Sequence, residues 1–282
     1  MKKLANKYII AVVLASLGLS SCVKKFDASS YAPPLTINGY TSASQIAPTN
    51  LVAHWTFNGT LTDSISNTTG VATGTSFSGG LEGQALQGAN NSYVLSALPP
   101  AVQSLHSFTV STWVNMSENT TGAVGLLSIV NSQTFWSNLD IFFNNGATPT
   151  VGQLEVHIFN NGASATGTDV FIGSVAVNNP FGGWVNVTLT YDDTKSTFVL
   201  YYNGGSIATD VVTGFAPLNW TGATQMIFGT LPFMANPSLT SGATAQGWAT
   251  YLTGALDETR IYNVALTSIE VSSLVGLQRR GK

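Results

Sequence analysis

The chain has 282 residues, of which 44% are hydrophobic, so it can bury a full core as one or two domains. Only 8% are charged, against about a quarter in a typical domain, so Ser, Thr, Asn and Gly must cover the surface. Between residues 51 and 275, Lys195 and Arg260 are the basic residues against twelve acidic ones, a formal charge of −10. Without a basic patch to follow a phosphate backbone, nucleic acid is excluded as a partner, and nothing favours acidic lipid.

The N-terminus has the pattern of a secretory signal. Three lysines precede an uncharged run over residues 8–19, which is too short for a membrane span of about 20 residues. The run ends in LSSC (19–22), which resembles the lipobox of bacterial lipoproteins, where cleavage precedes a cysteine that is lipidated. We therefore expect a lipoprotein signal peptide over 1–22 with lipidated Cys22, and a lipid-anchored protein of the bacterial cell envelope, at the outer membrane. The alternative is an ordinary signal peptide with an incidental cysteine.

Three parts are expected after the signal. Residues 23–50 contain Pro33, Pro34 and many Ser, Thr and Ala without a sustained hydrophobic period, so they are predicted to form a flexible tether. A single folded domain is predicted over 51–275. The tail over 276–282 is basic and is expected to fray. With one cysteine in the chain, no disulfide can form within it.

Alternating apolar and polar residues predict a β-meander over 183–204 and the residues that follow. Val185, Val187 and Leu189 share one face of a half-buried strand, and a second strand follows the polar break at 192–196. Asn203-Gly204 tolerates positive φ, so a third strand near 206–209 is expected to fold back there.

Many short strands with frequent turn signals predict a sandwich or jelly roll. Strands are expected near 51–57, 71–77, 85–95, 108–114, 124–131, 136–143, 152–159, 169–177, 225–229 and 252–262. The turn signals at 144–146 and 160–162 separate strands, and the long loop over 230–247 is typical of a functional or disordered segment. A capping box at Thr267 and Glu270 predicts one helix of about two turns, ending near Val275.

Four stretches in order resemble the laminin-G-like, concanavalin A-like jelly-roll domains of bacteria. The first is the meander, with Trp-x-x-Val-x-x-x-Tyr-Asp, a polar turn and Tyr-Asn-Gly. The others are LVAHWTFNGTLTDS (51–64), FTVSTWVN (108–115) and GALDETRIYNVALTSIEV (254–271). The resemblance implies an all-β, antiparallel two-sheet β-sandwich with one short C-terminal helix. It implies little about activity, since one fold hosts many functions.

Some relatives of this fold are glycoside hydrolases, whose retaining members carry Glu-x-Asp-x-x-Glu on one strand. Nothing here matches that pattern. Glu155 has no second acid before Asp169, and the neighbours Asp257 and Glu258 are expected to face opposite ways on a strand. The three histidines are isolated, and no Ser/His/Asp signature appears. We therefore expect no catalytic residue, and keep a glycosidase with a carboxylate pair assembled across strands as an alternative.

Calcium is the metal that the resemblance implies, because many relatives hold a structural Ca²⁺ with carboxylates and carbonyls. The corresponding residues here are Asp63 in the opening loop and Asp257 in the closing strand. Asn58 stands where relatives often have an aspartate. The alternatives are an Asx-turn at Asp63 and a partner for Arg260 at Asp257 or Glu258.

Three of the six tryptophans are candidates for a ligand surface, and the other three are not. Trp55, Trp113 and Trp184 lie in the motif strands and are expected to serve the fold. The candidates for stacking on sugars lie near loops, with amides close in sequence: Trp136, Trp220, Trp248, Asn131, Gln133, Asn138 and Asn219. The alternative is packing at the rim of the core.

Aromatic walls with a few polar groups and little charge suit a neutral sugar. We therefore predict a non-catalytic, envelope-anchored module that binds a neutral glycan. The alternative is an adhesin or scaffold that binds a cell-surface protein, which the low charge and the long loop favour.

Overall fold

The computed structural model of the protein describes residues 36–161, 167–220 and 222–282. The expected signal peptide, Cys22 and the first part of the expected tether lie outside the described residues. Ile37 to Lys282 form one compact unit. Among the described residues, no helix is long and apolar enough to cross a membrane.

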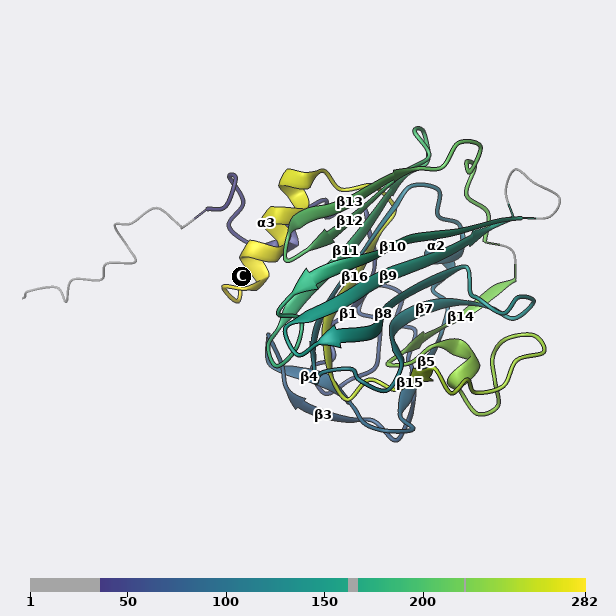
Figure 1. The fold of residues 1–282 in the computed structure, drawn as a ribbon. Helices are drawn as coiled ribbons and strands as arrows, with labels where there is room; N and C mark the ends of the chain where they lie inside the picture. The colour runs from purple at the N-terminus through teal and green to yellow at the C-terminus, as the bar shows by residue number, and fades with distance from the viewer. Residues whose placement is uncertain (1–35, 162–166, 221) are drawn as a thin grey trace, which may run out of the picture. The chain divides into compact units, whose positions relative to one another are not determined.

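The described residues form two antiparallel sheets of eight strands each (Figure 1). The first sheet runs in the order β13 (Gly205–Val211), β12 (Thr197–Tyr202), β11 (Val185–Asp192), β6 (Phe108–Met116), β16 (Gly254–Tyr262), β4 (Gln84–Gly88) and β3 (Ser76–Gly79), with β1 (Leu51–Trp55) also paired to β16.

The second sheet runs in the order β10 (Thr168–Asn178), β9 (Val151–Asn160), β8 (Leu139–Thr148), β7 (Ala123–Asn131), β14 (Ala223–Phe228), β5 (Tyr93–Ala97) and β2 (Val71–Thr73). The short β15 (Ala249–Thr250) adds to β7 in parallel. The helices are α2 (Pro100–Gln103), α3 (Ser268–Gln278) and two 3₁₀ turns, η2 (Ala43–Gln45) and η3 (Pro232–Met234). The predicted fold class, a two-sheet sandwich with a short C-terminal helix, is confirmed.

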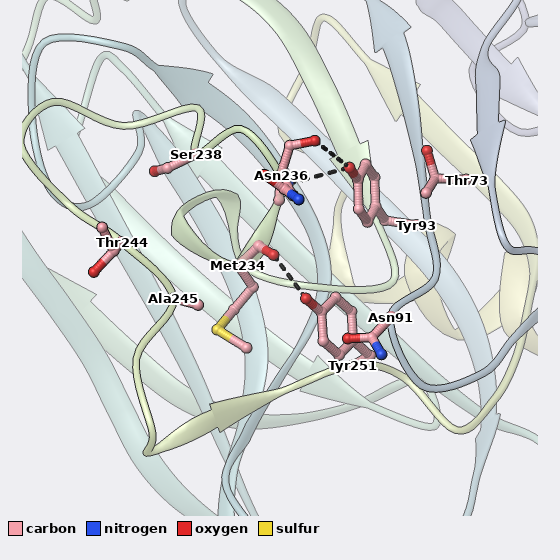
Figure 2. A pocket seen from close by; sticks show the side chains of 10 residues that line it. Thr73, Asn91, Tyr93, Met234, Asn236, Ser238, Thr244, Ala245 and Tyr251 are labelled. Atoms are coloured by element: carbon pink, nitrogen blue, oxygen red, sulfur yellow. Dashed lines mark hydrogen bonds between the residues drawn. The ribbon is translucent and has the colours of Figure 1, made fainter.

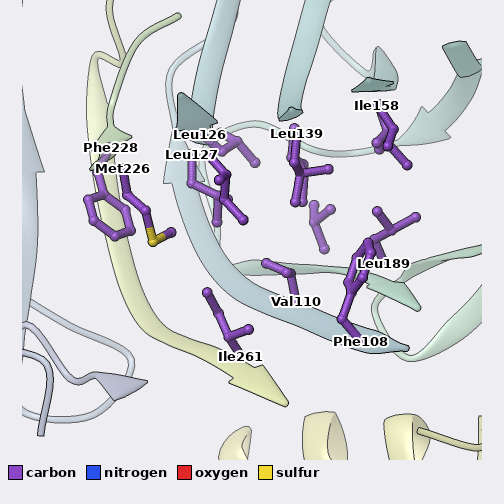
Figure 3. Packing of buried hydrophobic residues seen from close by; sticks show 14 of the residues in the cluster. Phe108, Val110, Leu126, Leu127, Leu139, Ile158, Leu189, Met226, Phe228 and Ile261 are labelled. Carbon is purple, nitrogen blue, oxygen red and sulfur yellow. The ribbon is translucent and has the colours of Figure 1, made fainter. Parts of the chain in front are cut away.

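The core lies between the two sheets. Figure 3 shows Leu127, Leu139 and Ile158 of the second sheet facing residues of the first sheet such as Val110 and Leu189. These side chains are fully buried. Alternate positions on each strand supply them, because successive side chains point to opposite faces of a sheet.

The predicted meander is confirmed. β11 pairs with β6 on one side and β12 on the other, and β12 pairs with β13. Asn203 and Gly204 turn with φ of 51° and 83°, the left-handed conformation that the Asn-Gly pair tolerates. The turn expected at 144–146 is wrong, because β8 continues through these residues to Thr148 with an irregular register against β9.

Helix α3 begins where the capping box predicted, with the Thr267 side chain accepting from the Glu270 amide at 3.2 Å. It is longer than expected and ends at Gln278. The frayed tail over 276–282 is a wrong prediction. Gln278 is 1% exposed and accepts from the Trp113 indole at 2.9 Å, and the Lys282 carbonyl accepts from the Ala43 amide at 2.9 Å.

The flexible tether predicted over 23–50 is wrong for residues 37–50. Ala43 and Ile46 are buried and pack in one cluster with Leu274 and Leu277 of α3. This segment is built from successive turns around η2, which bury apolar residues without a helix or strand period. The lack of a sustained hydrophobic period therefore predicts a tether where the chain is in fact ordered. Together with α3, it covers the outer face of the first sheet, where Tyr201 belongs to the same cluster.

Candidate ligand-binding surface

The outer face of the second sheet carries the side chains that form the candidate site. Leu139 and Ile141 of β8 lie in the core, so Asp140 and Phe142 point to the opposite side. One row of cross-strand neighbours on this outer face reads Ile227, Ser128, Asp140, His157 and Phe171, from β14 to β10.

The loop over 230–247 covers the middle of this outer face, beside β14, β5 and β15 in Figure 1. Phe233 and Met234 of η3 pack with Phe142 of β8. Ala235 packs with Tyr93 of β5 and other residues of the middle strands. The loop is therefore an ordered cover, and the strands β8 to β10 lie beyond its edge.

Five aromatic residues form a surface at that edge, which we call the aromatic platform: Phe135, Trp136, Phe171, Phe233 and Trp248. They come from four segments, namely the β7–β8 loop, β10, η3 and the residue before β15. Trp248 is 45% exposed and Phe171 is 43% exposed, and both Phe135 and Trp136 are half-buried. The buried Phe233 supports them from below.

The rings of the aromatic platform contact one another closely. Trp136 lies at the centre, with its ring 5.8 Å from Trp248 and 5.4 Å from Phe171 between centroids. Phe135 stacks on Phe233 at 4.8 Å, and Phe233 lies 5.1 Å from Trp248. These separations are those of favourable aromatic pairs, so the rings hold one another in fixed orientations.

Backbone pairing fixes the position of Trp248. Its carbonyl accepts from the Ala123 amide at 2.8 Å, and β15 then pairs with the start of β7. A Cβ on Gly122 would lie 2.7 Å from the Trp248 carbonyl oxygen, so glycine is required for this close approach.

A buried imidazole lies under the aromatic platform between two carboxylates. His157 is fully buried, its Nδ1 lies 3.1 Å from Asp140 Oδ2, and its Nε2 bonds Asp169. Burial disfavours the imidazolium, but the hydrogen bonds to Asp140 and Asp169 outweigh it and raise the pKa of His157. The Trp136 ring lies 5.3 Å away and the Phe171 ring 4.7 Å away. The Asp169 side chain is 58% exposed, so this network holds one reachable carboxylate beside the rings.

The structure brings together two of the three predicted stacking tryptophans. Trp136 and Trp248 meet in the aromatic platform. Trp220 is a wrong prediction, because it is 3% exposed and packs in the core against Phe108 at 5.2 Å. Its position near a loop did not reveal that its ring turns inward between the sheets.

The predicted amides divide in the same way. Asn131 and Asn138 are 1% and 0% exposed and bond each other at 3.1 Å, so as sugar contacts they are wrong predictions. Gln133 is exposed in the β7–β8 loop that carries Trp136. Asn219 is exposed, but it lies in the loop of the buried Trp220.

Sequence reasoning missed Phe135, Phe171, Phe233 and Asp169. The alternation of β10 contains a signal for two of them, since Asp169 and Phe171 are two residues apart and therefore share a face. Phe233 lies in the long loop, where no hydrophobic period indicates that its ring is buried. No local pattern places the four segments of the aromatic platform side by side.

Two hollows in the described surface have sizeable volumes. A pocket of about 490 Å³ lies between the long loop and the strands β2 and β5, with Tyr93 and Tyr251 among its walls (Figure 2). A groove of about 230 Å³ lies at the first sheet, lined by residues that include Trp184 and Asn115. Trp184, expected to serve the fold alone, is half-buried there.

The two predicted calcium ligands do not fit that role in this arrangement. Asp63 is fully buried, and its oxygens accept from the His54 amide at 2.6 Å, the Ile65 amide at 3.0 Å and the Ser66 amide at 3.0 Å. This is the Asx-turn that the sequence allowed as the alternative.

Asp257 is also fully buried, and it accepts from the backbone amides of Leu81, Glu82 and Glu258 at 2.8 to 3.1 Å. Burial, opposed by these donors, raises the pKa of Asp257 to about 7. The oxygens of both aspartates are thus occupied by N–H donors, and the described residues contain no group of three His, Cys, Asp or Glu suited to a metal ion. Calcium binding itself stays a prediction.

The glycosidase alternative gains no support from the acids on this surface. A glycosidase needs two carboxylates that reach the scissile bond from opposite sides. Asp140 is fully buried below Trp136, and Asp169 is bonded to His157. Glu258 of the first sheet is buried and bonded to Arg260.

Comparison with known proteins identifies the family. The family model of the concanavalin A-like lectin/glucanases superfamily, Laminin_G_3, matches residues 87–272. The chain belongs to this family. No curated protein matches the sequence.

Several solved structures share the fold. The binding domain of paraclostridial mosquitocidal protein 1 superposes with a TM-score of 0.60 at 18% identity, covering 80% of this chain and 52% of that one. Domain 4 of AbnA, a GH43 extracellular arabinanase from Geobacillus stearothermophilus in complex with arabinotriose, gives 0.50 at 22% identity, covering 80% and 98%. The binding domain of botulinum neurotoxin DC in complex with rat synaptotagmin II gives 0.57 at 13% identity, covering 83% and 52%. The chain spans about half the length of these toxin chains, and at such identities the likeness concerns the fold.

Proposed function

We propose that this protein is a non-catalytic module that binds a neutral glycan on the aromatic platform. The observation that carries the proposal is the convergence of four chain segments on a partly exposed aromatic surface with a fixed carboxylate at its edge. An aromatic surface of this kind suits the C–H faces of sugar rings, and the carboxylate suits their hydroxyl groups.

The exposed rings have little value to the fold by themselves. Trp248 leaves 45% of its surface in water although it is held by backbone pairing and by three neighbouring rings. A large apolar side chain kept exposed in one fixed orientation favours an interaction with a partner. Because the orientation is fixed before binding, a ligand that stacks there loses little affinity to ordering of the protein.

Asp169 supplies the polar part of the surface. One of its oxygens is bonded to His157, which also contacts Asp140, so the carboxylate does not move freely. The rest of its exposed surface is available to accept hydrogen bonds from hydroxyl groups. A charged acceptor forms stronger hydrogen bonds than a neutral one.

Two solved structures of the same fold are complexes with a bound partner, which favours a binding role. One is the arabinanase domain in complex with arabinotriose, and the other is the neurotoxin binding domain in complex with synaptotagmin II. Because the neurotoxin domain is bound to a protein, protein binding becomes the proposed function of this chain if no glycan is found. A patch containing Trp248 and Phe171 also suits the apolar core of a protein interface.

The test is a glycan array probed with the purified protein, followed by calorimetric titration of the best neutral oligosaccharide. Replacing Trp248 with Ala should weaken binding by about 1–2 kcal/mol, or about tenfold, because one stacking ring is lost. Trp184→Ala is the matched control, since it removes a half-buried tryptophan from the first sheet. If the array shows no glycan, the proposal fails and a protein partner becomes the leading function. If a glycan binds but Trp184→Ala has the larger effect, the aromatic platform is not the binding site and the groove beside Trp184 replaces it.

We also propose that the protein is anchored to the bacterial envelope, at the outer membrane, through lipid on Cys22. The LSSC sequence after a short uncharged run supports this proposal. Changing Cys22 to Ser should abolish lipidation and release or stall the precursor. Detection of lipid by mass spectrometry on the variant, together with its recovery in membranes, would contradict the proposal.

A further inference from the structure

The pocket of about 490 Å³ lies on the other side of η3 from the aromatic platform. Phe233 supports the platform, and its neighbour Met234 lines the pocket. Figure 2 shows Thr244 and other loop residues on one side of the pocket, facing Tyr93 and Thr73 on the other. The volume falls within the range of small-molecule sites, roughly 300–1,000 Å³.

Two tyrosine rings form firm walls of this pocket. Tyr93 is 5% exposed, and its hydroxyl donates to the Asn236 carbonyl and accepts from the Asn236 amide, both at 3.2 Å. The Tyr251 hydroxyl donates to the Met234 carbonyl at 2.8 Å. Both hydroxyls are thus used to fix the loop, and the rings present apolar surface to the pocket.

The rim carries polar groups that are free to meet a ligand. The side chains of Thr73, Asn91, Asn236 and Thr244 are exposed, and within the described residues none of them makes a side-chain hydrogen bond. Each of these hydroxyl and amide groups can both donate and accept. No Asp, Glu, Lys, Arg or His lines the pocket.

We propose that this pocket is a second binding site, which takes a single neutral sugar unit. The lining offers apolar ring surface and groups that both donate and accept, the two features that a pyranose or furanose ring requires. A charged sugar would lose hydration without gaining an opposite charge, so uronic acids and amino sugars should be excluded. The aromatic platform, in contrast, holds the carboxylate of Asp169.

The shapes of the two sites predict different ligand sizes. The pocket encloses a ligand between the loop and the sheet, so a free monosaccharide has enough contacts to bind there. The aromatic platform is an open surface, on which several units of a chain must contribute. Monosaccharide binding therefore reports on the pocket, and oligosaccharide binding that depends on Trp248 reports on the platform.

The experiment is an NMR titration of the purified protein with glucose, galactose, mannose and arabinose, and with glucuronic acid and glucosamine as charged counterparts. At least one neutral monosaccharide should bind saturably, and the charged sugars should not. The double change Thr73→Val and Thr244→Val keeps the side-chain shapes and removes two hydroxyls, so binding should weaken about tenfold or more. Thr213→Val is the matched control, because Thr213 is exposed and does not line the pocket.

Trp248→Ala separates this inference from the proposed function, because it should leave monosaccharide binding unchanged. The inference is overturned if no neutral monosaccharide binds, if the charged sugars bind equally well, or if the double variant binds as the wild type does. It is also overturned if Trp248→Ala abolishes monosaccharide binding. Loss of oligosaccharide binding in Trp248→Ala with intact monosaccharide binding supports both sites.

Discussion

The outer faces of the two sheets differ in how far the chain itself covers them. Over β12 and β16 the first sheet is covered by α3 and residues 37–50, which bury outward side chains such as Tyr201 and Tyr262 in one cluster, while the groove beside Trp184 is lined by neither segment. The second sheet is covered only over its middle strands by the long loop, and it leaves the aromatic platform exposed at β8 to β10. One sandwich therefore has a face closed by its own chain and a face open to a partner.

The polar groups of the two faces differ in the same sense. On the closed face, Glu258 is buried and accepts from Arg260 at 2.8 Å and from Gln278 at 3.2 Å, with His54 Nε2 at 2.9 Å. Burial alone would raise the pKa of Glu258, but His54 and Arg260 outweigh it and lower that pKa. On the open face, Asp169 remains 58% exposed. The polar network of the closed face is thus used within the fold, and the network of the open face presents a group to solvent.

The largest expected effect comes from disrupting the buried polar network of the closed face. Glu258→Gln removes the charge that compensates Arg260, which is 7% exposed, so the unfolding free energy should fall by about 3 kcal/mol. Urea denaturation measures the loss. Lys195→Ala is the control, because its ion pair with Asp192 is on the surface and should change stability by about 0.5 kcal/mol or less. A loss below about 1 kcal/mol for Glu258→Gln would show that the network is not structural.

A smaller effect tests whether residues 37–50 belong to the closed face. Ile46 is 1% exposed, so Ile46→Ala should lower the unfolding free energy by about 2 kcal/mol through lost burial and a cavity. Thr49→Ala changes an exposed neighbour and should have little effect. Equal stabilities of the two variants would show that the prediction of a flexible tether over 23–50 is right.

Local patterns in the sequence predicted the parts of the fold that depend on neighbouring residues. The alternation around Val187 and Leu189, the turn at Asn203-Gly204 and the capping box at Thr267 are all confirmed. Period two and cap chemistry depend on nearby residues alone, so a single sequence is enough to reveal them.

The candidate site could be predicted only in part, because it depends on contacts between distant segments. Trp136 and Trp248 were selected for lying near loops, and so was Trp220, which faces Phe108 in the core. Which way a ring turns depends on the sheet opposite it. The contact of Trp136 with Phe171 depends on strand order, which no short pattern contains.

The stability that His157 contributes beneath the open face should depend on pH. Because the pKa of His157 is raised in the folded protein, its bonds to Asp140 and Asp169 stabilise the fold fully below the unfolded value of about 6.5. That contribution is lost as the pH rises through the folded value. His157→Gln should therefore cost about 1–2 kcal/mol at pH 5.5 and less at pH 9, as measured by thermal melting. A difference that is constant over this range would contradict the charged imidazole.

The smallest expected effect concerns calcium at the first sheet. Because N–H donors occupy the oxygens of Asp63 and Asp257, a chelator should leave the melting temperature of calcium-purified protein unchanged. Asp257→Asn should melt in the same way with and without the chelator. A melting temperature that falls in chelator for the wild type, but not for Asp257→Asn, would show that these carboxylates rearrange around an ion.

The central claim is that the open face of the second sheet binds the glycan. The most direct measurement is a ¹H–¹⁵N NMR titration that follows the indole N–H signals as a neutral oligosaccharide selected from the array is added. We predict that the signals of Trp136 and Trp248 shift together and saturate, and that those of Trp55, Trp113 and Trp184 stay in place. Saturable shifts at Trp184 with unchanged signals from Trp136 and Trp248 would place the ligand on the first sheet and contradict the account.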